Sequence, residues 1–217
     1  MPPALEIVFT APIVSFRNPL YDGLQVGLPC PPPSTVGGAL AAAAGGWDHV
    51  PDTTRFAMTF HAAGFGTDLE TYHPLANPGT PANITIKDRD FLAMTTLTVW
   101  LVTDLDRWQH ALRRPVWPMR LGRSQDLVAA RTRCVELSTG PGTQGHAIVP
   151  DTLPHAAGTR FRLTTAVSID RARTRWGSYR YAAQGAATDI DTGLVTDTGQ
   201  AVALLPPIHP AQLSASA

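Results

Sequence analysis

The alternation of apolar and polar residues predicts four strands in the first half of the chain. Residues 4–10 alternate as an opening strand does, residues 55–63 are predicted as a second strand, and residues 91–103 contain a run rich in β-branched residues. Residues 116–121 are predicted as a further strand.

Two helices are predicted between these strands. The first covers residues 34–44, where small residues are followed by two glycines that end it. The second covers residues 104–113 and ends before a proline. Prolines and glycines predict a loop over residues 11–33 and a long excursion over residues 64–88.

The predicted order β-α-β-β-α-β is that of the split βαβ, or ferredoxin-like, arrangement. We therefore expect an α+β fold in which residues 1–126 form a ferredoxin-like domain with an insertion at residues 64–88. Residues 127–217 are expected as a β-rich C-terminal part packed on that domain. Its short strands are predicted at residues 131–137, 160–169, 175–182 and 200–205. This fold hosts many functions and identifies none of them.

Composition narrows the class of protein. The chain is 44% apolar with a mean hydropathy of −0.02, as soluble globular proteins are. No apolar run reaches the roughly 18–20 residues of a membrane span, and the stretch at residues 5–16 lacks the preceding cation of a signal peptide. Cys30 and Cys134 are too few for a disulfide framework, so we expect reduced thiols in a cytoplasmic protein, with a single disulfide as the alternative.

The net charge of zero conceals an uneven distribution. Residues 1–106 hold four basic and ten acidic side chains, whereas residues 107–180 hold thirteen basic and four acidic ones. The middle segment therefore predicts a basic face for a polyanion, with an unevenly charged solvated surface as the alternative. All basic residues except Lys87 are arginines, which pair with phosphates and stack on bases.

Signatures of catalytic chemistry are mostly missing from the sequence. Neither a phosphate-binding loop nor a dinucleotide, hydrolase or zinc-protease motif occurs, and the seven histidines lack metal-site spacing, so we expect neither cofactor nor metal. One cluster could act on RNA without a metal: Tyr72 and His73, with His61 upstream and Lys87 downstream, could supply a base, an acid and a cation. Polar residues on a loop are the simpler interpretation.

The start of the first helix predicts a phosphate site. A rigid proline segment leads directly to Ser34 and Thr35, either of which would cap the helix. Free N–H groups and the helix dipole favour a phosphate there, and Gly37 and Gly38 would let a backbone come close. Ordinary capping with close packing explains the same residues equally well.

A second candidate site lies at residues 115–126, where the predicted strand runs into a glycine turn. Gly122 makes the turn, and Arg120, Arg123 and Ser124 flank it. Such a turn can hold a backbone phosphate or direct an arginine at a base.

Taken together, these stretches resemble the fifth CRISPR-associated (Cas) family, the RAMP subunit of type I Cascade. The similar segments, in chain order, are Leu5 to Phe9, Ser15 to Arg17, Pro32 to Gly38, Arg89 to Leu92 and Ala111 to Ser124. The resemblance covers about residues 4–126 and is nearest to the type I-B-like branch.

The resemblance implies a RAMP palm with residues 64–88 as an inserted thumb. It implies a non-catalytic subunit that binds the 5′ handle of CRISPR RNA and caps the filament of Cascade backbone subunits. It would also contact the large subunit, meet target DNA through the complex and have no membrane partner. In the type I-C branch the subunit cuts precursor RNA with Tyr, Lys and His. A metal-independent endoribonuclease using Tyr72, His73 and Lys87 is therefore the alternative, although their register departs from the expected one.

The expected RNA-binding residues fall into three groups. The two stronger groups are Arg17, Ser34, Thr35, Gly37 and Gly38 at the first helix, and Arg120, Gly122, Arg123 and Ser124 at the glycine turn. A weaker group is Arg171, Arg173 and Arg175 with Trp176, whose alternation could equally be a solvated strand edge. A β-rich small-molecule binding module is a second alternative, based on Trp47, Trp100, Trp108, Trp117 and Trp176.

Overall fold

The computed structural model describes residues 1–21, 26–72 and 84–213, which form nine strands, two α-helices and two short 3-10 helices. In chain order the elements are β1 (Pro3–Val14), α1 (Pro33–Ala44), η1 (Trp47–His49), β2 (Phe56–Tyr72), β3 (Thr85–Leu101), α2 (Leu105–Arg113), β4 (Ala129–Glu136), β5 (Pro141–Gly145), β6 (Val149–Pro150), β7 (Thr159–Val167), β8 (Thr174–Tyr181), β9 (Ala186–Asp191) and η2 (Pro210–Leu213). No helix in these ranges is long and apolar enough to cross a membrane.

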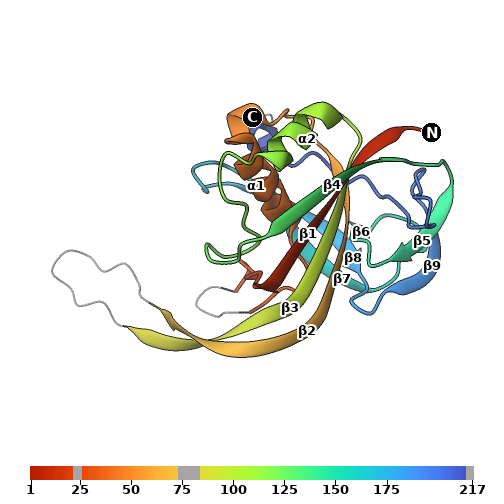
Figure 1. Ribbon diagram of the computed structural model, residues 1–217. Coiled ribbons are helices and arrows are strands. Elements are labelled where there is room, and N and C mark those ends of the chain that lie inside the picture. The colour runs from red at the N-terminus through yellow and green to blue at the C-terminus, as the bar shows by residue number, and fades with distance from the viewer. Residues whose placement is uncertain (22–25, 73–83, 214–217) are drawn as a thin grey trace.

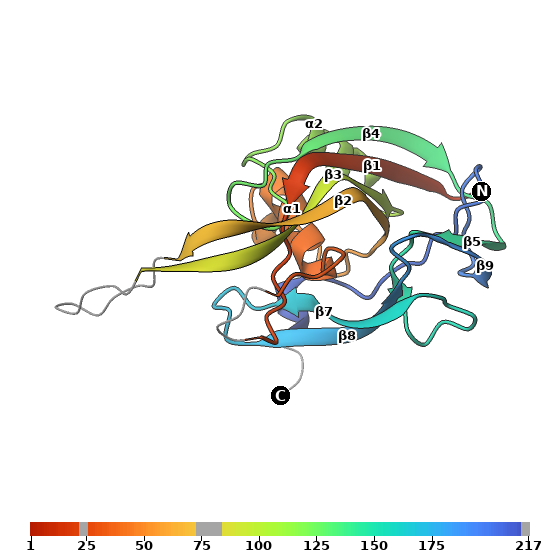
Figure 2. The same cartoon turned by 90° about the horizontal axis from the view of Figure 1, so that it is seen from below.

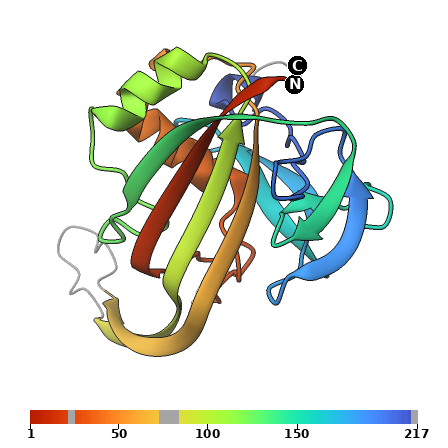
Figure 3. The same ribbon diagram turned by 45° about the vertical axis from the view of Figure 1, so that its right-hand side comes forward.

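The central sheet has four strands in the order β2-β3-β1-β4, and every neighbouring pair is antiparallel (Figure 1). Helix α1 lies between β1 and β2 in the chain, and α2 lies between β3 and β4. Figure 3 shows the sheet from the face opposite the helices. The protein is therefore a sheet-rich α+β protein, as the sequence predicted.

Alternation along β1 explains how the sheet is covered. Leu5, Ile7 and Phe9 point to one face, where they are buried in the main core with α1, α2 and the β7–β8 hairpin. Figure 2 shows this as two layers, the sheet and the hairpin, with α1 between them. Burying such side chains stabilises the fold by about 1.5–3 kcal/mol each. On the opposite face Ala4 belongs to a second, smaller core that is covered by residues 194–204.

Strands β2 and β3 continue beyond the sheet as a hairpin that projects from the body (Figure 1). Their pairing runs without a break from Gly64 to Tyr72. Residues 64–72 and 85–88, predicted as part of an irregular excursion, are therefore paired strands, and residues 73–83 lie outside the described residues. Gly66 fits in this strand because the Phe91 ring of the facing strand covers it. A Cβ added to Gly66 would lie only 2.6 Å from that ring.

The predicted strand at residues 116–121 was also wrong. The backbone N–H groups of Val116 and Trp117 donate instead to the last carbonyls of α1, each at 3.1 Å, and two flanking prolines cannot donate at all. The fourth strand of the sheet is β4, so strand pairing extends beyond residue 126, where the sequence placed the end of the first domain.

Strand β1 runs to Val14, four residues past its predicted end. Pro12 is tolerated because β4 pairs with β1 only as far as Thr10, so the strand has a free edge on that side. The C-terminal part is β-rich, with a two-stranded sheet β5-β9 and a three-stranded sheet β6-β8-β7. Residues 200–205, predicted as a strand, form only isolated bridges at Gln200 and Ala201.

Candidate nucleic-acid interface

The start of α1 is packed into the fold. The cap position is Pro32, which makes no side-chain hydrogen bond, so the prediction that Ser34 or Thr35 caps the helix was wrong. Ser34 Oγ shares a 2.5 Å hydrogen bond with Thr164 Oγ1 of β7. Gly37 is buried, and a Cβ there would lie 2.8 Å from Ile208 Cδ1. Ser34 and Gly37 thus join α1 to its neighbours, a role different from the predicted phosphate contact.

Gly38, by contrast, is exposed, with no atom within 4 Å of the position of an added Cβ. It lines a hollow together with Ala42 of α1 and three residues of the next predicted site, Trp117, Pro118 and Arg120. The two sequence stretches predicted to bind RNA therefore meet at this hollow. Thr35 is half-buried on the same helix and does not line the hollow.

The hollow is shaped by the end of α1. Gly45 ends the helix in the left-handed conformation with φ 93°, which a glycine adopts without strain. A Cβ on Gly45 would lie 3.2 Å from Val116, and one on Gly46 would lie 3.6 Å from the Trp117 ring. Close packing at these two glycines places the indole beside α1, where 53% of Trp117 remains exposed.

The hollow contains one cationic side chain, the exposed Arg120. Arg113 and Arg114, at the end of α2, are exposed as well and precede the hollow's residues 117–120 in the chain. None of the ion pairs among the described residues involves these three arginines. An exposed indole can stack on an unpaired base, and unpaired guanidinium groups can hold phosphates, so this surface has the chemistry of a single-stranded nucleic-acid site.

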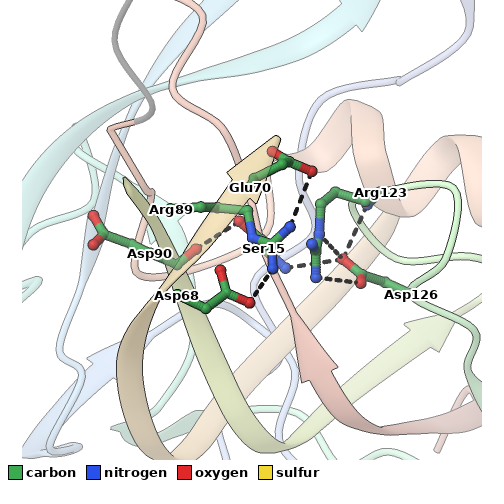
Figure 4. A network of polar contacts seen from close by, with 7 residues as sticks. All are labelled: Ser15, Asp68, Glu70, Arg89, Asp90, Arg123 and Asp126. Carbon is green, nitrogen blue, oxygen red and sulfur yellow. Dashed lines mark hydrogen bonds and ion pairs between the residues drawn. The ribbon is translucent and has the colours of Figure 1, made fainter. Parts of the chain in front are cut away.

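The glycine turn itself is a closed structural unit (Figure 4). Arg123 donates to Asp126 Oδ2 from its backbone N and from Nε, both at 3.1 Å, and to Oδ1 from Nη2 at 2.8 Å. Asp126 is only 4% exposed and also accepts the backbone N–H of Ser15 at 3.0 Å. Gly122 has φ 106°, and a Cβ there would lie 2.4 Å from the Ser15 carbonyl oxygen. The Arg123 guanidinium therefore points at its own turn, while Ser124 is exposed.

The turn is tied to the root of the hairpin. Ser15 Oγ donates to the Asp90 carbonyl at 2.6 Å, and the Asp90 carboxylate accepts from Thr67 at 3.1 Å and from the Gly27 N–H at 3.4 Å. In the same hairpin, the Arg89 guanidinium of β3 donates to the carboxylates of Asp68 and Glu70 of β2 (Figure 4). Ser15, Asp90 and Arg123 belong to three of the segments that carry the family resemblance, and these contacts bring the three segments together. They hold the base of the hairpin against the glycine turn.

The remaining predicted arginines lie elsewhere. Arg17 is exposed on the loop after β1, in a bridge with Gly27, and does not line the hollow. Arg173 donates to the Leu213 carbonyl at 3.3 Å, and Arg175 donates to the Pro207 carbonyl. Arg171 is exposed in the β7–β8 turn. The third group therefore mainly anchors the C-terminal segment.

The residues of the catalytic alternative are not gathered in the described part of the chain. His73 and the side chain of Tyr72 lie outside the described residues, and Lys87 lies on β3 opposite Glu70. His61 is nine residues from Glu70 along β2, about 30 Å of strand. It contacts His146 instead, with ring centroids 4.8 Å apart, and burial together with His61 lowers the pKa of His146. No local sequence signal marks this pair, because its members are far apart in the chain.

The tryptophans do not form a common binding surface. Trp100 and Trp108 are buried, and Trp100 Nε1 donates to Glu6 Oε2 at 3.1 Å. Trp47 packs edge-on against His209, with centroids 5.4 Å apart. A groove of about 830 Å³ lies between the loop after β1 and the hairpin root and is lined by none of the five tryptophans. Burial raises the pKa of Tyr181 in its wall.

Comparison with known proteins gives the family. The chain matches the family described as "CRISPR-associated protein (Cas_Cas5)" over residues 4–193. Among solved structures, it is similar to a chain of a CRISPR RNA-guided surveillance complex, with 18% identity, a TM-score of 0.56 and 96% coverage of both chains. It is also similar to a CRISPR protein from Archaeoglobus fulgidus, with 12% identity, a TM-score of 0.52 and coverage of 94% and 99%. No curated protein matches the chain. The protein belongs to the CRISPR-associated Cas_Cas5 family, the family that its sequence resembles.

Proposed function

We propose that this protein is a non-catalytic subunit of a type I Cascade complex and holds the 5′ handle of CRISPR RNA. The observation that carries the proposal is the hollow formed by Gly38, Trp117 and Arg120, in a member of a CRISPR-associated family. It unites an exposed aromatic ring, an unpaired guanidinium and bare helix backbone, which are the elements that single-stranded RNA recognition uses.

In the proposed complex, one splayed base of the handle stacks on Trp117, a contact worth about 1–3 kcal/mol. Arg120 bonds to an adjacent phosphate, which contributes about 1.5–3 kcal/mol. Because Gly38 lacks a side chain, the sugar-phosphate backbone can lie against α1. Arg113 and Arg114 attract the strand at longer range.

The finer parts of the proposal rest on the arrangement of the elements. The strand order β2-β3-β1-β4 with two intervening helices supports a ferredoxin-like RAMP palm. The projecting β2–β3 hairpin would be its thumb, through which the subunit would cap the filament of backbone subunits next to the large subunit. Both cysteines are free, which is compatible with a cytoplasmic protein.

The test is binding of a labelled handle RNA to the purified protein, or its occupancy in the assembled complex. Trp117→Ala should weaken binding by at least about fivefold and Arg120→Ala by about tenfold. Arg131→Ala is the matched control, because Arg131 is an exposed arginine on β4 outside the hollow, and it should change affinity less than twofold. Wild-type affinity in both hollow variants, with unchanged melting temperatures, would overturn the proposal.

A further inference from the structure

The outer face of the β7–β8 hairpin carries a second set of arginines that the sequence analysis did not single out. Along β7, Phe161 and Leu163 pack toward the main core, so Arg160 and Arg162 point outward. Arg180 of β8 lies on the same outer face, directly opposite Arg160 in the strand register. Figure 2 shows this hairpin as the outermost layer of the molecule on the side opposite the four-stranded sheet.

Two like charges directly opposite each other destabilise an antiparallel pair. Here Asp151 lies between them, with Oδ2 3.0 Å from Arg160 Nε and Oδ1 2.7 Å from Arg180 Nε. One carboxylate against two guanidinium groups leaves a net positive charge. The side chains of Arg160 and Arg180 are 65% and 37% exposed, so both can bind an anion without being displaced from Asp151.

Arg162, two residues from Arg160 on β7, adds a guanidinium group above an aromatic ring. Its guanidinium carbon lies 5.4 Å from the centre of the Trp176 ring, in a cation–π contact, and its side chain is exposed. No ion pair among the described residues involves Arg162. A guanidinium group above an indole can offer its own planar face to a base.

We propose that this outer face binds a single strand of nucleic acid without regard to sequence. The phosphates lie on Arg160 and Arg180, and an unpaired base stacks on Arg162 over Trp176. Arginines that track a backbone beside an aromatic stacking platform are the usual elements of sequence-tolerant single-strand sites. A duplex would offer the phosphates but no free base face. None of these residues lines the hollow proposed for the handle, so this surface is a separate site.

The experiment uses the full-length protein and a labelled oligo-dT of about 12 nucleotides, which lacks any handle sequence. Arg162→Ala should weaken binding at least about fivefold. Arg162→Lys keeps the charge but loses the planar group, and it should fall between wild type and Arg162→Ala. Arg131→Ala is again the matched control and should bind within twofold of wild type. A base-paired form of the same length should bind more weakly than the single strand.

Handle RNA is measured in parallel to separate the two proposals. Arg162→Ala should leave handle affinity within about twofold, and Trp117→Ala should leave oligo-dT affinity within about twofold. Equal oligo-dT affinity in Arg162→Ala and Arg131→Ala would overturn the single-strand site, whatever the handle RNA does. Wild-type affinity in Arg162→Lys, or equal competition by polyglutamate at matched charge, would reduce the surface to a site for acidic partners and would also overturn it.

Discussion

Arg123→Ala should destabilise the glycine turn. The Arg123 side chain pairs with Asp126 of the same turn and does not line the hollow proposed to bind RNA. The substitution removes two charge-assisted side-chain bonds to Asp126, whose carboxylate is 4% exposed. Removing one partner of a buried ion pair costs about 3–5 kcal/mol. Asp126 keeps the backbone N–H groups of Ser15 and residue 123, so we take the lower end, about 3 kcal/mol. For a chain of this size that corresponds to a fall in melting temperature of about 6–12 °C.

The assay is thermal melting at neutral pH, followed by circular dichroism. Arg120→Ala serves as the control because that side chain is exposed and outside any ion pair among the described residues, so it should melt within about 2 °C of wild type. The double variant Arg123→Ala/Asp126→Ala should be less destabilised than the sum of the single variants, with a coupling of about 1–3 kcal/mol. If Arg123→Ala melts like Arg120→Ala, the turn does not depend on this pair and the reasoning is refuted.

Four further outcomes are expected. Gly38→Ala should raise stability by about 0.5–1 kcal/mol while weakening handle RNA binding, whereas Gly122→Ala should lower stability by about 1–3 kcal/mol in the same melting assay. Because burial lowers the pKa of His146 in the fold, the unfolded chain binds the proton first. Stability should therefore fall as the pH drops below about 6.5 toward the lower folded pKa, and His146→Gln should flatten this dependence; a flat wild-type profile would contradict it. Repeat RNA incubated with the protein without metal should remain intact on a gel, and a defined cut that His73→Ala abolishes would establish the catalytic alternative.

Local pattern predicted the order of the elements because that order depends on residues near one another in sequence. The elements β1, α1, β2, β3 and α2 occur in the predicted order, and α1 ends at the predicted glycine. The predicted bounds of these elements were wrong where a contact with a distant part of the chain determines the conformation. Gly64 and Gly66 suggest irregular chain on their own, but the facing strand and the Phe91 ring hold them in a regular hairpin. The strand predicted at residues 116–121 was wrong for the same reason, because the N–H groups of Val116 and Trp117 donate to carbonyls of α1.

For the candidate site too, local sequence predicted individual residues but could not predict which of them the fold brings together. Gly38 and Arg120 were predicted from two separate stretches, and the fold brings them to one hollow. Arg123 flanks the same glycine turn as Arg120 but points inward, because it forms an ion pair with Asp126 three positions later. That Asp126 is visible in the sequence, and the i, i+3 spacing could have indicated an internal pair. No local signal marked the β7–β8 face, since its arginines converge only through strand register.

The segment from residue 194 onward lies outside the family match, yet it is part of the minimal folding unit. Val202 covers the buried indole of Trp100, and Leu205 and Ile208 complete the main core. A fragment truncated at residue 193 would therefore expose apolar surface on both faces of the sheet, and we expect it to aggregate on expression. Domain limits for expression trials are better set by burial than by the extent of sequence similarity.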